Sequence, residues 1–392
     1  MRQCELTHSW INFQAIDLNE VRPRHWMLLG EARSKCEHLA GAPIKPDAGK
    51  KLYEVTLIKG ALATTAIEGN TLTEDQVRGI FDGSYKAPPS RQYQEQEVRN
   101  VLEALQSLHD RILAGELIQI TPELICEFNE QVLKDTHYRD GVIPGVIRTE
   151  SVVVGGYRAA PAEECAYLLE RLTNWLNSPI FESNDPGFQF ALTIAEAVYA
   201  HLYIAWIHPF GDGNGRTARL LEFLILARCG LVPVPAGHLL SNHYNLTRDH
   251  YYRELALSSK PGQSTLGFLS YAIEGFIDGI RETIEMVRVN QISVAWINYV
   301  HERFASQPNT KATARQRTLV LAMPMISPVP RDDLEGLTPK LAKLYAVAGP
   351  RTLSRDLNTV TGLDLIRQTR GGYRVNSQIV QAFLPPMAAA DG

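Results

Sequence analysis

The chain has 392 residues, of which 45% are hydrophobic and 21% are charged, and its formal net charge is −4. This composition is typical of a globular protein and excludes a disordered or collagen-like chain. The length predicts two or three domains.

The sequence carries no pattern typical of membrane insertion or secretion. No run of 18 or more apolar residues indicates a membrane-spanning helix, and the first ten residues, MRQCELTHSW, lack the apolar core of a secretory signal peptide. The five cysteines are widely spaced and match neither a metal-binding pattern nor a disulfide framework. We therefore expect a cytoplasmic protein that makes no contact with a membrane.

Charge is distributed unevenly along the chain. Residues 310–375 hold eleven Lys and Arg against five Asp and Glu, whereas residues 1–309 carry a balance of −9. A shift of this kind indicates a separate C-terminal module. We expect an N-terminal helical region at 1–120, a core at 121–290, and a linker helix with a small domain at 291–392.

The N-terminal region contains one helix with a clear pattern, at about residues 48–68. Apolar residues recur there at helical spacing after Pro46. The helix ends in the sequence TTAIEGN, which spans residues 64–70. Taken alone, this segment is an amphipathic helix with a Gly/Asn stop, which is common in proteins.

Two further helices are expected at 95–114 and 122–134, and the one clear strand signal follows them. Residues 141–160 contain two β-prone runs on either side of a Gly-Gly pair. This pattern predicts a tight hairpin, with its two strands at about 146–158. By itself it is equally typical of an ordinary hairpin with no role at a site.

The most informative stretch runs from His208 to Arg219 and reads HPFGDGNGRTAR. It lies between two apolar runs with helical patterning. We expect a helix, a glycine-bearing loop and a second helix start, which offer free N–H groups and a positive dipole end to an anion. Arg216 and Arg219 share one helix face and can reach phosphate oxygens from the same side. Asp212 is suited to Mg²⁺, and His208 to accepting a proton from a hydroxyl.

This stretch matches neither of two common phosphate-binding loops. It lacks the Gly-Lys-Ser/Thr ending of a Walker A loop, and Arg216 replaces the third glycine of the dinucleotide fingerprint. It instead resembles the Fic family signature, HPFx(D/E)GN(G/K)RxxR, with no departure at a fixed position. The resemblance implies a mainly α-helical Fic fold, with a β-hairpin flap on a helical bundle. It also implies transfer of AMP from ATP to a hydroxyl group of a protein.

The resemblance implies a role for each signature residue. His208 would be the general base that deprotonates the target hydroxyl, and Asp212 would bind Mg²⁺. Arg216 would contact the β-phosphate region and Arg219 the γ-phosphate. The anion hole for the α- and β-phosphates would be formed by Gly213, Asn214 and Gly215.

Beside this signature, the end of the helix at 48–68 resembles the family's inhibitory pattern, (S/T)xxxE(G/N). Thr64, Glu68 and Gly69 stand at its fixed positions, and their place is similar to the class in which the inhibitory helix precedes the Fic core. We expect a bidentate contact between the Glu68 carboxylate and the Arg219 guanidinium, which would deny this arginine to the γ-phosphate. In some relatives the same glutamate helps to position water that removes AMP from a modified target.

The hairpin at 146–158 is similar in position to the Fic flap, which covers the active site and docks the target backbone by strand addition. The resemblance implies that the residues nearest to the nucleotide and target are Val154, Gly155, Gly156 and Tyr157.

Tyr251 belongs to a Tyr-Tyr pair that is common in Fic proteins. We expect it either to border the adenosine or to be semi-buried packing. Ser259 replaces an asparagine seen in some relatives, which leaves the recognition of the base, and with it the choice of ATP, open.

The C-terminal module is expected to contain short helices at 331–344 and 352–358 and a hairpin at 366–375. This order resembles a winged-helix domain, which implies either DNA contact or a protein or dimer contact. The second reading is favoured because the module is only moderately basic and poor in aromatics. The arginines that would contact DNA are Arg351, Arg355, Arg367, Arg370 and Arg374.

We expect a Fic-family protein adenylyltransferase that uses ATP and Mg²⁺ and is autoinhibited by Glu68. The resemblance implies as partners a protein with a Ser, Thr or Tyr hydroxyl, the chain itself as acceptor, and a second copy in a homodimer. Two alternatives stay open: removal of AMP with Glu68 as a participant, and an ATP-sensing DNA-binding regulator without transferase activity. Relatives that transfer UMP, phosphate or phosphocholine also leave the transferred group open.

Overall fold

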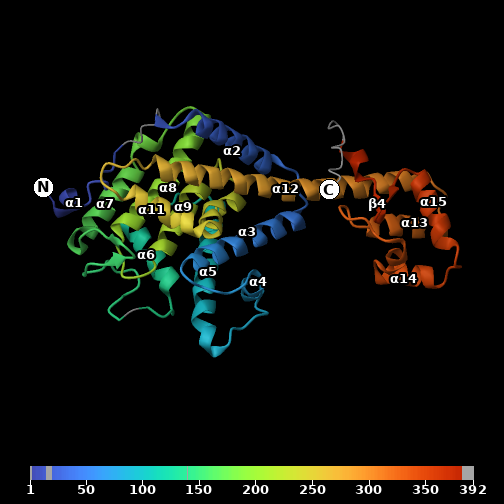
Figure 1. The fold of residues 1–392 in the computed structure, drawn as a ribbon, viewed down its shortest axis with the longest axis horizontal. Coiled ribbons are helices and arrows are strands. Elements are labelled where there is room, and N and C mark those ends of the chain that lie inside the picture. The colour runs from blue at the N-terminus through green and yellow to red at the C-terminus, as the bar shows by residue number, and fades with distance from the viewer. Residues whose placement is uncertain (1, 15–19, 139, 382–392) are drawn as a thin grey trace. The chain divides into compact units, whose positions relative to one another are not determined.

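The computed structural model describes residues 2–14, 20–138 and 140–381. The chain is mainly α-helical, as predicted (Figure 1). It divides into two compact units, residues 1–284 and 285–392. The last eleven residues of the second unit lie outside the described part of the chain.

The first unit is a bundle of helices with one short hairpin. Its helices are α1 (Gln3–Thr7), α2 (Pro23–Gly41), α3 (Pro46–Ile67), α4 (Glu74–Asp82), α5 (Gln92–Leu113), α6 (Pro122–Leu133), α7 (Cys165–Leu176), α8 (Pro186–Ile207), α9 (Asn214–Arg228), α10 (Leu239–Leu246) and α11 (Arg248–Ser258). The strands β1 (Val153–Val154) and β2 (Tyr157–Arg158) form the hairpin. The long helix α12 (Leu266–Ala305) gives its residues up to 284 to this unit and the remainder to the second.

The centre of the first unit is α8, which packs against α9 (Figure 1). Pro186 occupies the first turn, and the Asp185 side chain accepts a hydrogen bond from the N–H of Phe188, which caps the helix start. The helix is long and apolar enough to cross a membrane, but 94% of its most apolar window is buried inside the unit. Here α8 is a core helix, and its burial fixes where the chain enters the loop after Ile207.

The helix α3 carries the segment that the sequence singled out. Pro46 stands at its start, and Glu68 is its C-terminal capping residue. Gly69 then turns the chain with a φ of 101°, a conformation that favours glycine. The helix packs against α5, α9 and α10, so its last turn is held against the core.

The hairpin is shorter than expected. Val153 pairs with Arg158 and Val154 with Tyr157, and Gly155 takes a φ of 58° in the turn. The rest of the predicted span is irregular, because Ile147 forms an isolated antiparallel bridge with Phe210 instead of continuing the hairpin. The base of the hairpin is therefore attached to the loop that follows α8.

The second unit contains α13 (Lys311–Ala322), α14 (Pro339–Ala346), α15 (Thr352–Gly362) and a hairpin of β3 (Ile366–Thr369) and β4 (Gly372–Val375). The single helix expected at 331–344 is wrong. A 3₁₀ segment, Arg331–Gly336, comes first, and α14 starts at Pro339 after Thr338 caps it. Proline lacks the N–H that a continuing helix needs but fits a first helical position.

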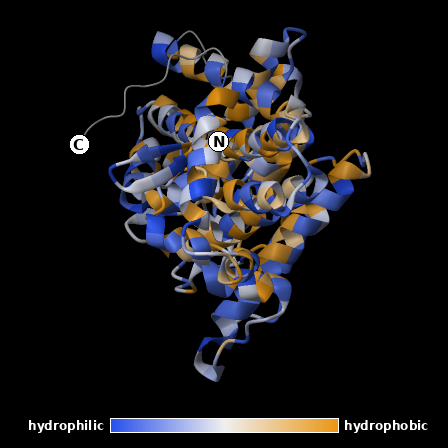
Figure 2. Ribbon diagram, turned by 90° about the vertical axis from the view of Figure 1, so that its right-hand side faces the viewer, coloured by the Kyte–Doolittle hydropathy of each residue, from blue (hydrophilic) through white to orange (hydrophobic). Residues whose placement is uncertain are grey.

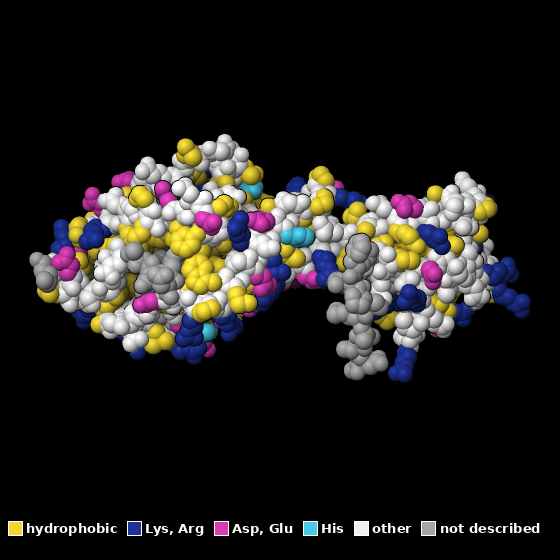
Figure 3. Space-filling view, turned by 90° about the horizontal axis from the view of Figure 1, so that it is seen from above, with side chains coloured by type: hydrophobic (Ala, Val, Ile, Leu, Met, Phe, Trp, Pro, Cys, Tyr) yellow, Lys and Arg dark blue, Asp and Glu magenta, His cyan; other side chains and the backbone are white. Residues whose placement is uncertain are grey.

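The second unit has its own hydrophobic core, built from α12, α13, α14, α15 and the hairpin. Along the helices, hydrophobic and hydrophilic residues alternate, as expected where each helix buries one face (Figure 2). Asp356 is 2% exposed and is held by Arg315, Gln316 and Tyr345. On the face drawn in Figure 3, Lys and Arg side chains project from this unit at its right-hand edge.

Candidate active site

The loop after α8 begins at His208, which adopts a left-handed conformation with φ 50° and ψ 58°. Such a conformation is uncommon for a residue other than glycine and persists only where the surroundings enforce it. The His208 N–H donates to the Ile204 carbonyl at 2.8 Å, which closes the last turn of α8. Burial lowers the pKa of His208 to about 4. The imidazole is therefore neutral at pH 7 and able to accept a proton.

Arg148, from the base of the hairpin, fixes this loop from one side. Its side chain donates to the carbonyl oxygens of His208 at 2.7 Å, Glu150 at 2.6 Å and Ala160 at 2.5 Å. Its backbone N–H donates to the Pro209 carbonyl at 3.0 Å. Arg148 thus joins both legs of the hairpin to the backbone of His208.

Asn129, from α6, fixes the loop from the other side. Its side-chain amide donates to the Asp212 carbonyl at 2.9 Å and accepts from the Gly145 N–H at 3.0 Å. Gly213 has a φ of 74°, and a Cβ there would lie 3.0 Å from the Asn129 amide nitrogen. The position therefore requires glycine for both its backbone and its space.

The helix α9 starts at Asn214, so the end of the glycine-rich string is helical. The Asn214 side chain accepts from the Phe210 N–H at 2.9 Å and donates to the Phe210 carbonyl at 2.8 Å. Its side chain therefore closes the loop on itself. The groups that this helix start offers to an anion are the backbone N–H groups of its first turn, which have no intrahelical acceptor.

Arg219 and Glu68 form the predicted pair, but the contact is not bidentate. The Arg219 Nη2 donates to one Glu68 carboxylate oxygen at 2.6 Å. The Arg219 Nε is already used by the Thr64 hydroxyl at 2.6 Å, and Nη2 also donates to the Thr64 carbonyl at 3.0 Å. Thr64 occupies the Nε of Arg219, so Glu68 cannot form a bidentate contact with Nε and Nη2. It binds Nη2 through one oxygen only, and Nη1 has no hydrogen-bond partner in the described structure.

The charge on Glu68 is stabilised by this pair. Burial alone would raise the pKa of Glu68, but the Arg219 charge and hydrogen bond outweigh burial and hold the pKa below its ordinary value. A Cβ at Gly215 would overlap the Glu68 carboxylate. Glu68 therefore lies directly over the first turn of α9, where an anion would bind.

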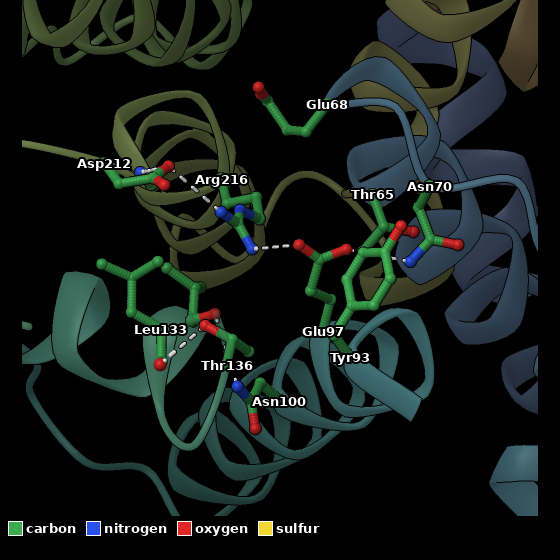
Figure 4. Close-up of polar contacts among 12 residues, drawn as sticks. Thr65, Glu68, Asn70, Tyr93, Glu97, Asn100, Leu133, Thr136, Asp212 and Arg216 are labelled. Carbon is green, nitrogen blue, oxygen red and sulfur yellow. Dashed lines mark hydrogen bonds and ion pairs between the residues drawn. The ribbon is translucent and has the colours of Figure 1, made fainter. Parts of the chain in front are cut away.

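Arg216 lies between two carboxylates, as Figure 4 shows. Its guanidinium is 3.4 Å from Asp212 and 3.4 Å from Glu97, a residue of α5. Glu97 also accepts a hydrogen bond from the Asn70 amide at 3.0 Å. Burial raises the pKa of Glu97 above its ordinary value, although Arg216 and Asn70 oppose the shift. Asn70 comes two residues after Glu68, so this contact links the end of α3 to Arg216.

These elements surround one cavity of about 920 Å³. One wall comes from α11 and includes Tyr251, Tyr252 and Ser259, and the hairpin supplies residues 154–158. The remaining lining includes Glu68, His208, Asn214, Gly215 and three residues of the N-terminal segment, Thr7, His8 and Trp10.

Comparison with known proteins identifies the domain that holds this cavity. Residues 119–226 match the model of the Fic/DOC family. The chain contains a Fic domain.

The Fic domain has relatives with curated names. Protein adenylyltransferase fic-1 of Caenorhabditis elegans is 33% identical over 220 residues, which cover 56% of this chain and 40% of that protein. The protein of the same name from Caenorhabditis briggsae is 37% identical with the same coverage. Protein adenylyltransferase Fic of Drosophila persimilis is 32% identical over 171 residues, which cover 44% of this chain and 31% of that protein. The matches thus span less than half the length of each relative.

Solved structures confirm the predicted Fic fold. A Fic family protein from Desulfovibrio desulfuricans G20 aligns with a TM-score of 0.55 at 21% identity, covering 91% of this chain and 96% of that chain. Fic-1 from C. elegans, residues 134–508, aligns with a TM-score of 0.55 at 28% identity, covering 68% of this chain and 72% of that chain.

The Fic-domain cavity brings together nine of the residues predicted from the sequence: Glu68, Val154, Gly155, Gly156, Tyr157, His208, Asn214, Gly215 and Tyr251. Arg216 and Arg219 do not line it. They are 5% and 3% exposed and lie behind the first turn of α9, covered by Glu97 and Glu68 respectively. Asp212, Gly213, Thr64 and Gly69 are neighbours of the lining in the loop and in α3.

Tyr251 lines the Fic cavity and is 3% exposed. Its hydroxyl is 2.9 Å from His201 Nε2 in the interior, so the phenol oxygen is engaged on the core side. His201 in turn faces Glu222 at 3.5 Å, and Glu222 accepts from Tyr244 at 2.8 Å. Tyr251 is therefore buried packing that also borders the cavity, and its place beside an adenosine stays a prediction.

Sequence reasoning missed Arg148, Asn129, Glu97 and Asn70 in the Fic domain and its N-terminal neighbour. Each acts across a long separation in sequence, for example 119 residues between Glu97 and Arg216. Asn70 was the only one with a local signal, since it follows the inhibitory pattern directly.

Proposed function

We propose that this protein transfers AMP from ATP to a hydroxyl group of a protein and that Glu68 restrains the reaction. The observation that carries the proposal is the placement of a neutral His208 beside the start of α9, in a cavity of about 920 Å³. The names of the relatives, protein adenylyltransferases, support the same chemistry.

Two orphaned groups support a phosphate ligand at this place. Arg216 Nε and Arg219 Nη1 are buried and have no hydrogen-bond partner in the described structure. An unsatisfied buried donor is costly, and more so when it is charged. Once Glu68 leaves the start of α9, phosphate oxygens there would supply an acceptor to the uncovered Arg219, in addition to meeting the free N–H groups of the first turn.

In the proposed reaction, His208 takes the proton of the target hydroxyl as its oxygen attacks the α-phosphorus of ATP. The new bond joins the hydroxyl oxygen to the α-phosphorus, and the bond to the bridging oxygen of the β-phosphate breaks. Pyrophosphate leaves with the electron pair. The N–H groups of α9 and the Arg216 guanidinium stabilise the charge that develops on the phosphates. Arg148 holds the His208 backbone so that the imidazole keeps its orientation.

The donor set fits Mg²⁺. Asp212 uses one oxygen for the Gly213 N–H and for Arg216, and its side chain is 37% exposed, which leaves its second oxygen for a cation. One protein carboxylate suffices for Mg²⁺, since this ion keeps waters and binds substrate phosphates. No cluster of three or more His, Cys, Asp or Glu side chains suited to a metal occurs in the described residues. When bound, the ion would neutralise phosphate charge during the transfer.

Removal of AMP is a second candidate activity of the same site. Glu68 lines the cavity, its side chain is 34% exposed, and only one of its oxygens contacts Arg219. The second oxygen would hold a water molecule near a bound phosphodiester. Glu68 would then restrain one reaction and take part in the reverse one.

The proposed partners are a protein with an accessible hydroxyl and the chain itself as acceptor. We extend the proposal to a homodimer and to a macromolecular contact through the winged-helix-like second unit. In that unit Arg351, Arg355, Arg367, Arg370 and Arg374 are all exposed, which suits either an acidic protein surface or DNA phosphates. A reducing, cytoplasmic setting agrees with five free cysteines.

The proposal is tested by label transfer from α-³²P-ATP with Mg²⁺, using the wild-type chain, Glu68→Gly, and Glu68→Gly combined with His208→Ala. We expect strong labelling of protein in Glu68→Gly, little in wild type, and a loss of about 10²- to 10⁴-fold when His208 is removed. ATP binding measured by calorimetry should survive in the His208→Ala variant. Undiminished transfer without His208 would remove its assignment as the base, and no label in any variant would remove the proposed function.

A further inference from the structure

The N-terminal segment, residues 7–10, belongs to the cavity although it lies nearly 200 residues before the Fic signature. The segment is firmly held. The backbone N–H groups of Gln3 and Cys4 donate to the buried Glu164 carboxylate at 2.9 and 3.0 Å. His8 Nε2 contacts the Arg158 carbonyl at 3.0 Å. This wall of the cavity is thus attached to the hairpin and to the segment before α7.

Hydrogen bonds hold the His8 ring at both of its nitrogens. A carbonyl oxygen only accepts, so His8 Nε2 carries the hydrogen that it donates to Arg158. His8 Nδ1 lies 2.7 Å from the Thr7 hydroxyl, which donates its own hydrogen to the Gln3 carbonyl at 2.9 Å. Both His8 nitrogens therefore make polar contacts that fix the ring, and the ring itself packs beside Trp10 and Tyr157.

The wall is aromatic. The His8 ring lies 5.1 Å from the Trp10 ring and 6.3 Å from the Tyr157 ring, and the Trp10 and Tyr157 rings are 6.3 Å apart. The Tyr157 hydroxyl donates to the Trp206 carbonyl at 2.8 Å, which places this ring against the last turn of α8, next to His208. We call His8, Trp10 and Tyr157 the aromatic wall. It differs from the wall formed by α11, where the Tyr252 hydroxyl donates a hydrogen bond to the Ile67 carbonyl at the end of α3.

The aromatic wall offers rings rather than polar groups to the cavity. The Trp10 Nε1–H is buried, and it interacts with the Tyr157 hydroxyl inside the wall itself. A ligand with a flat ring would stack on the wall. A short aliphatic hydroxyl side chain has no ring to stack.

We infer that the aromatic wall selects tyrosine as the acceptor residue, in preference to serine or threonine. The inference rests on the proposed function and narrows its substrate class. The phenol ring packs against His8, Trp10 and Tyr157. Its oxygen attacks the α-phosphorus of ATP, its proton passes to His208, and the products are a tyrosine–AMP phosphodiester and pyrophosphate.

The character of the base agrees with this choice. A histidine whose pKa is about 4 is a weak base, so it removes a proton more easily from an acidic hydroxyl. A phenol, with a pKa of about 10, is far more acidic than the hydroxyl of serine or threonine. Both the geometry of the wall and the strength of the base thus favour a phenol.

The test uses the full chain with Glu68→Gly and three synthetic peptides that differ only at the acceptor, which is Tyr, Thr or Ser. Extended, Val- and Lys-rich flanks allow each peptide to pair with the hairpin edge. We expect kcat/KM for the Tyr peptide to exceed that for the Thr peptide by roughly three- to tenfold or more, the range of an aromatic pair contact. Mass spectrometry of the self-labelled chain should likewise find AMP on tyrosine.

Variants of the wall show whether it causes the preference. Trp10→Ala should lower the ratio of kcat/KM for the Tyr peptide to that for the Thr peptide, measured within the same variant, towards one, and Trp10→Phe, which keeps a ring, should give a ratio between those of Trp10→Ala and the unaltered wall. Phe188→Ala serves as control, because it removes a ring that stacks on Trp26. The peptide ranking in the unaltered wall tests the inference even if Trp10→Ala does not fold.

The outcomes separate the inference from the function on which it rests. Label on Thr or Ser peptides at a rate equal to or above that of Tyr would overturn the acceptor inference and leave AMP transfer standing. Equal loss for all peptides in Trp10→Ala would do the same. If the peptides are not labelled but the chain labels itself, AMP on tyrosine would support the acceptor inference and AMP on serine or threonine would overturn it. No label on any protein or peptide would remove the proposed function and the inference together.

Discussion

Each of the two arginines of the Fic signature forms an ion pair with a glutamate outside the signature, and the two pairs differ in length and in exposure. Arg219 meets Glu68 at 2.6 Å, and this glutamate caps the end of α3 with a third of its side chain exposed. Arg216 meets Glu97 at 3.4 Å, and this glutamate lies within α5, is 17% exposed and is also held by Asn70. One pair is short and sits at a helix end. The other is long and built into the bundle.

This difference suggests two roles for the same chemistry. In the proposed function, Glu68 covers the place of an anion and would have to leave before a phosphate binds there. Glu97 does not line the cavity, so it would hold Arg216 without blocking the start of α9. Removing the two carboxylates should therefore change the rate of AMP transfer in opposite directions.

Among changes to the two pairs, the largest effect is expected for Glu68→Gly, which should raise the rate of AMP transfer by roughly ten- to hundredfold, the worth of one charge-assisted hydrogen bond to a buried arginine. Initial rates of α-³²P-AMP incorporation measure it. Glu68→Gln keeps the side chain and loses the charge, so its rate should lie between the two. A rate in Glu68→Gly no higher than in wild type would show that the Arg219 contact is not a restraint.

A smaller effect of opposite sign is expected for Glu97→Ala. Made in the Glu68→Gly chain, it should lower kcat/KM for ATP by about tenfold, because Arg216 loses a partner that fixes its position and keeps only Asp212. Glu103→Ala is the matched control, since it removes an exposed carboxylate from the same helix. An increase in rate in Glu97→Ala would make Glu97 a second restraint and end the contrast between the pairs.

The pH dependence of kcat/KM also distinguishes the two glutamates. Burial raises the pKa of Glu97, so as the pH falls this carboxylate takes up a proton above pH 4.5, the ordinary pKa of a glutamate. The pKa of Glu68 is lowered, so this carboxylate stays charged to a lower pH. His208, with a pKa of about 4, stays unprotonated until the pH approaches that value. In Glu68→Gly, kcat/KM should first decline as Glu97 is protonated and then fall steeply near pH 4. Adding Glu97→Gln should abolish the first decline only.

The same two pKa shifts also predict how the stability of the fold depends on pH. The raised pKa of Glu97 means that the folded state gains stability as pH falls through that pKa. The lowered pKa of Glu68 means that the contribution of its pair is lost only below the ordinary range of a glutamate. Thermal unfolding of wild type and Glu97→Gln between pH 7 and pH 5 measures the first of these. A parallel dependence in both chains would contradict the shift.

The sequence predicted the parts of this site that are local and missed those that join distant segments. The string from His208 to Arg219 and the end of α3 each carry enough neighbouring residues to define their own geometry. In the sequence, Glu97 is indistinguishable from the other charged residues of an amphipathic helix, because nothing near it in sequence shows that it contacts Arg216. The bidentate Glu68 contact was wrong for a similar reason, since the Thr64 hydroxyl occupies the Arg219 Nε.

The smallest effect concerns Asn70, the residue that connects the two pairs. Its amide donates to Glu97 at 3.0 Å and to the Gln94 carbonyl at 2.9 Å. In the Glu68→Gly chain, Asn70→Ala should lower kcat/KM by about two- to fivefold, the loss of one buried hydrogen bond. If Asn70 acts through Glu97, the same change should have no further effect once Glu97→Ala is present, because interacting residues are not additive. Equal losses with and without Glu97 would mean that Asn70 supports only the turn after α3, and the two arginine pairs would then be independent.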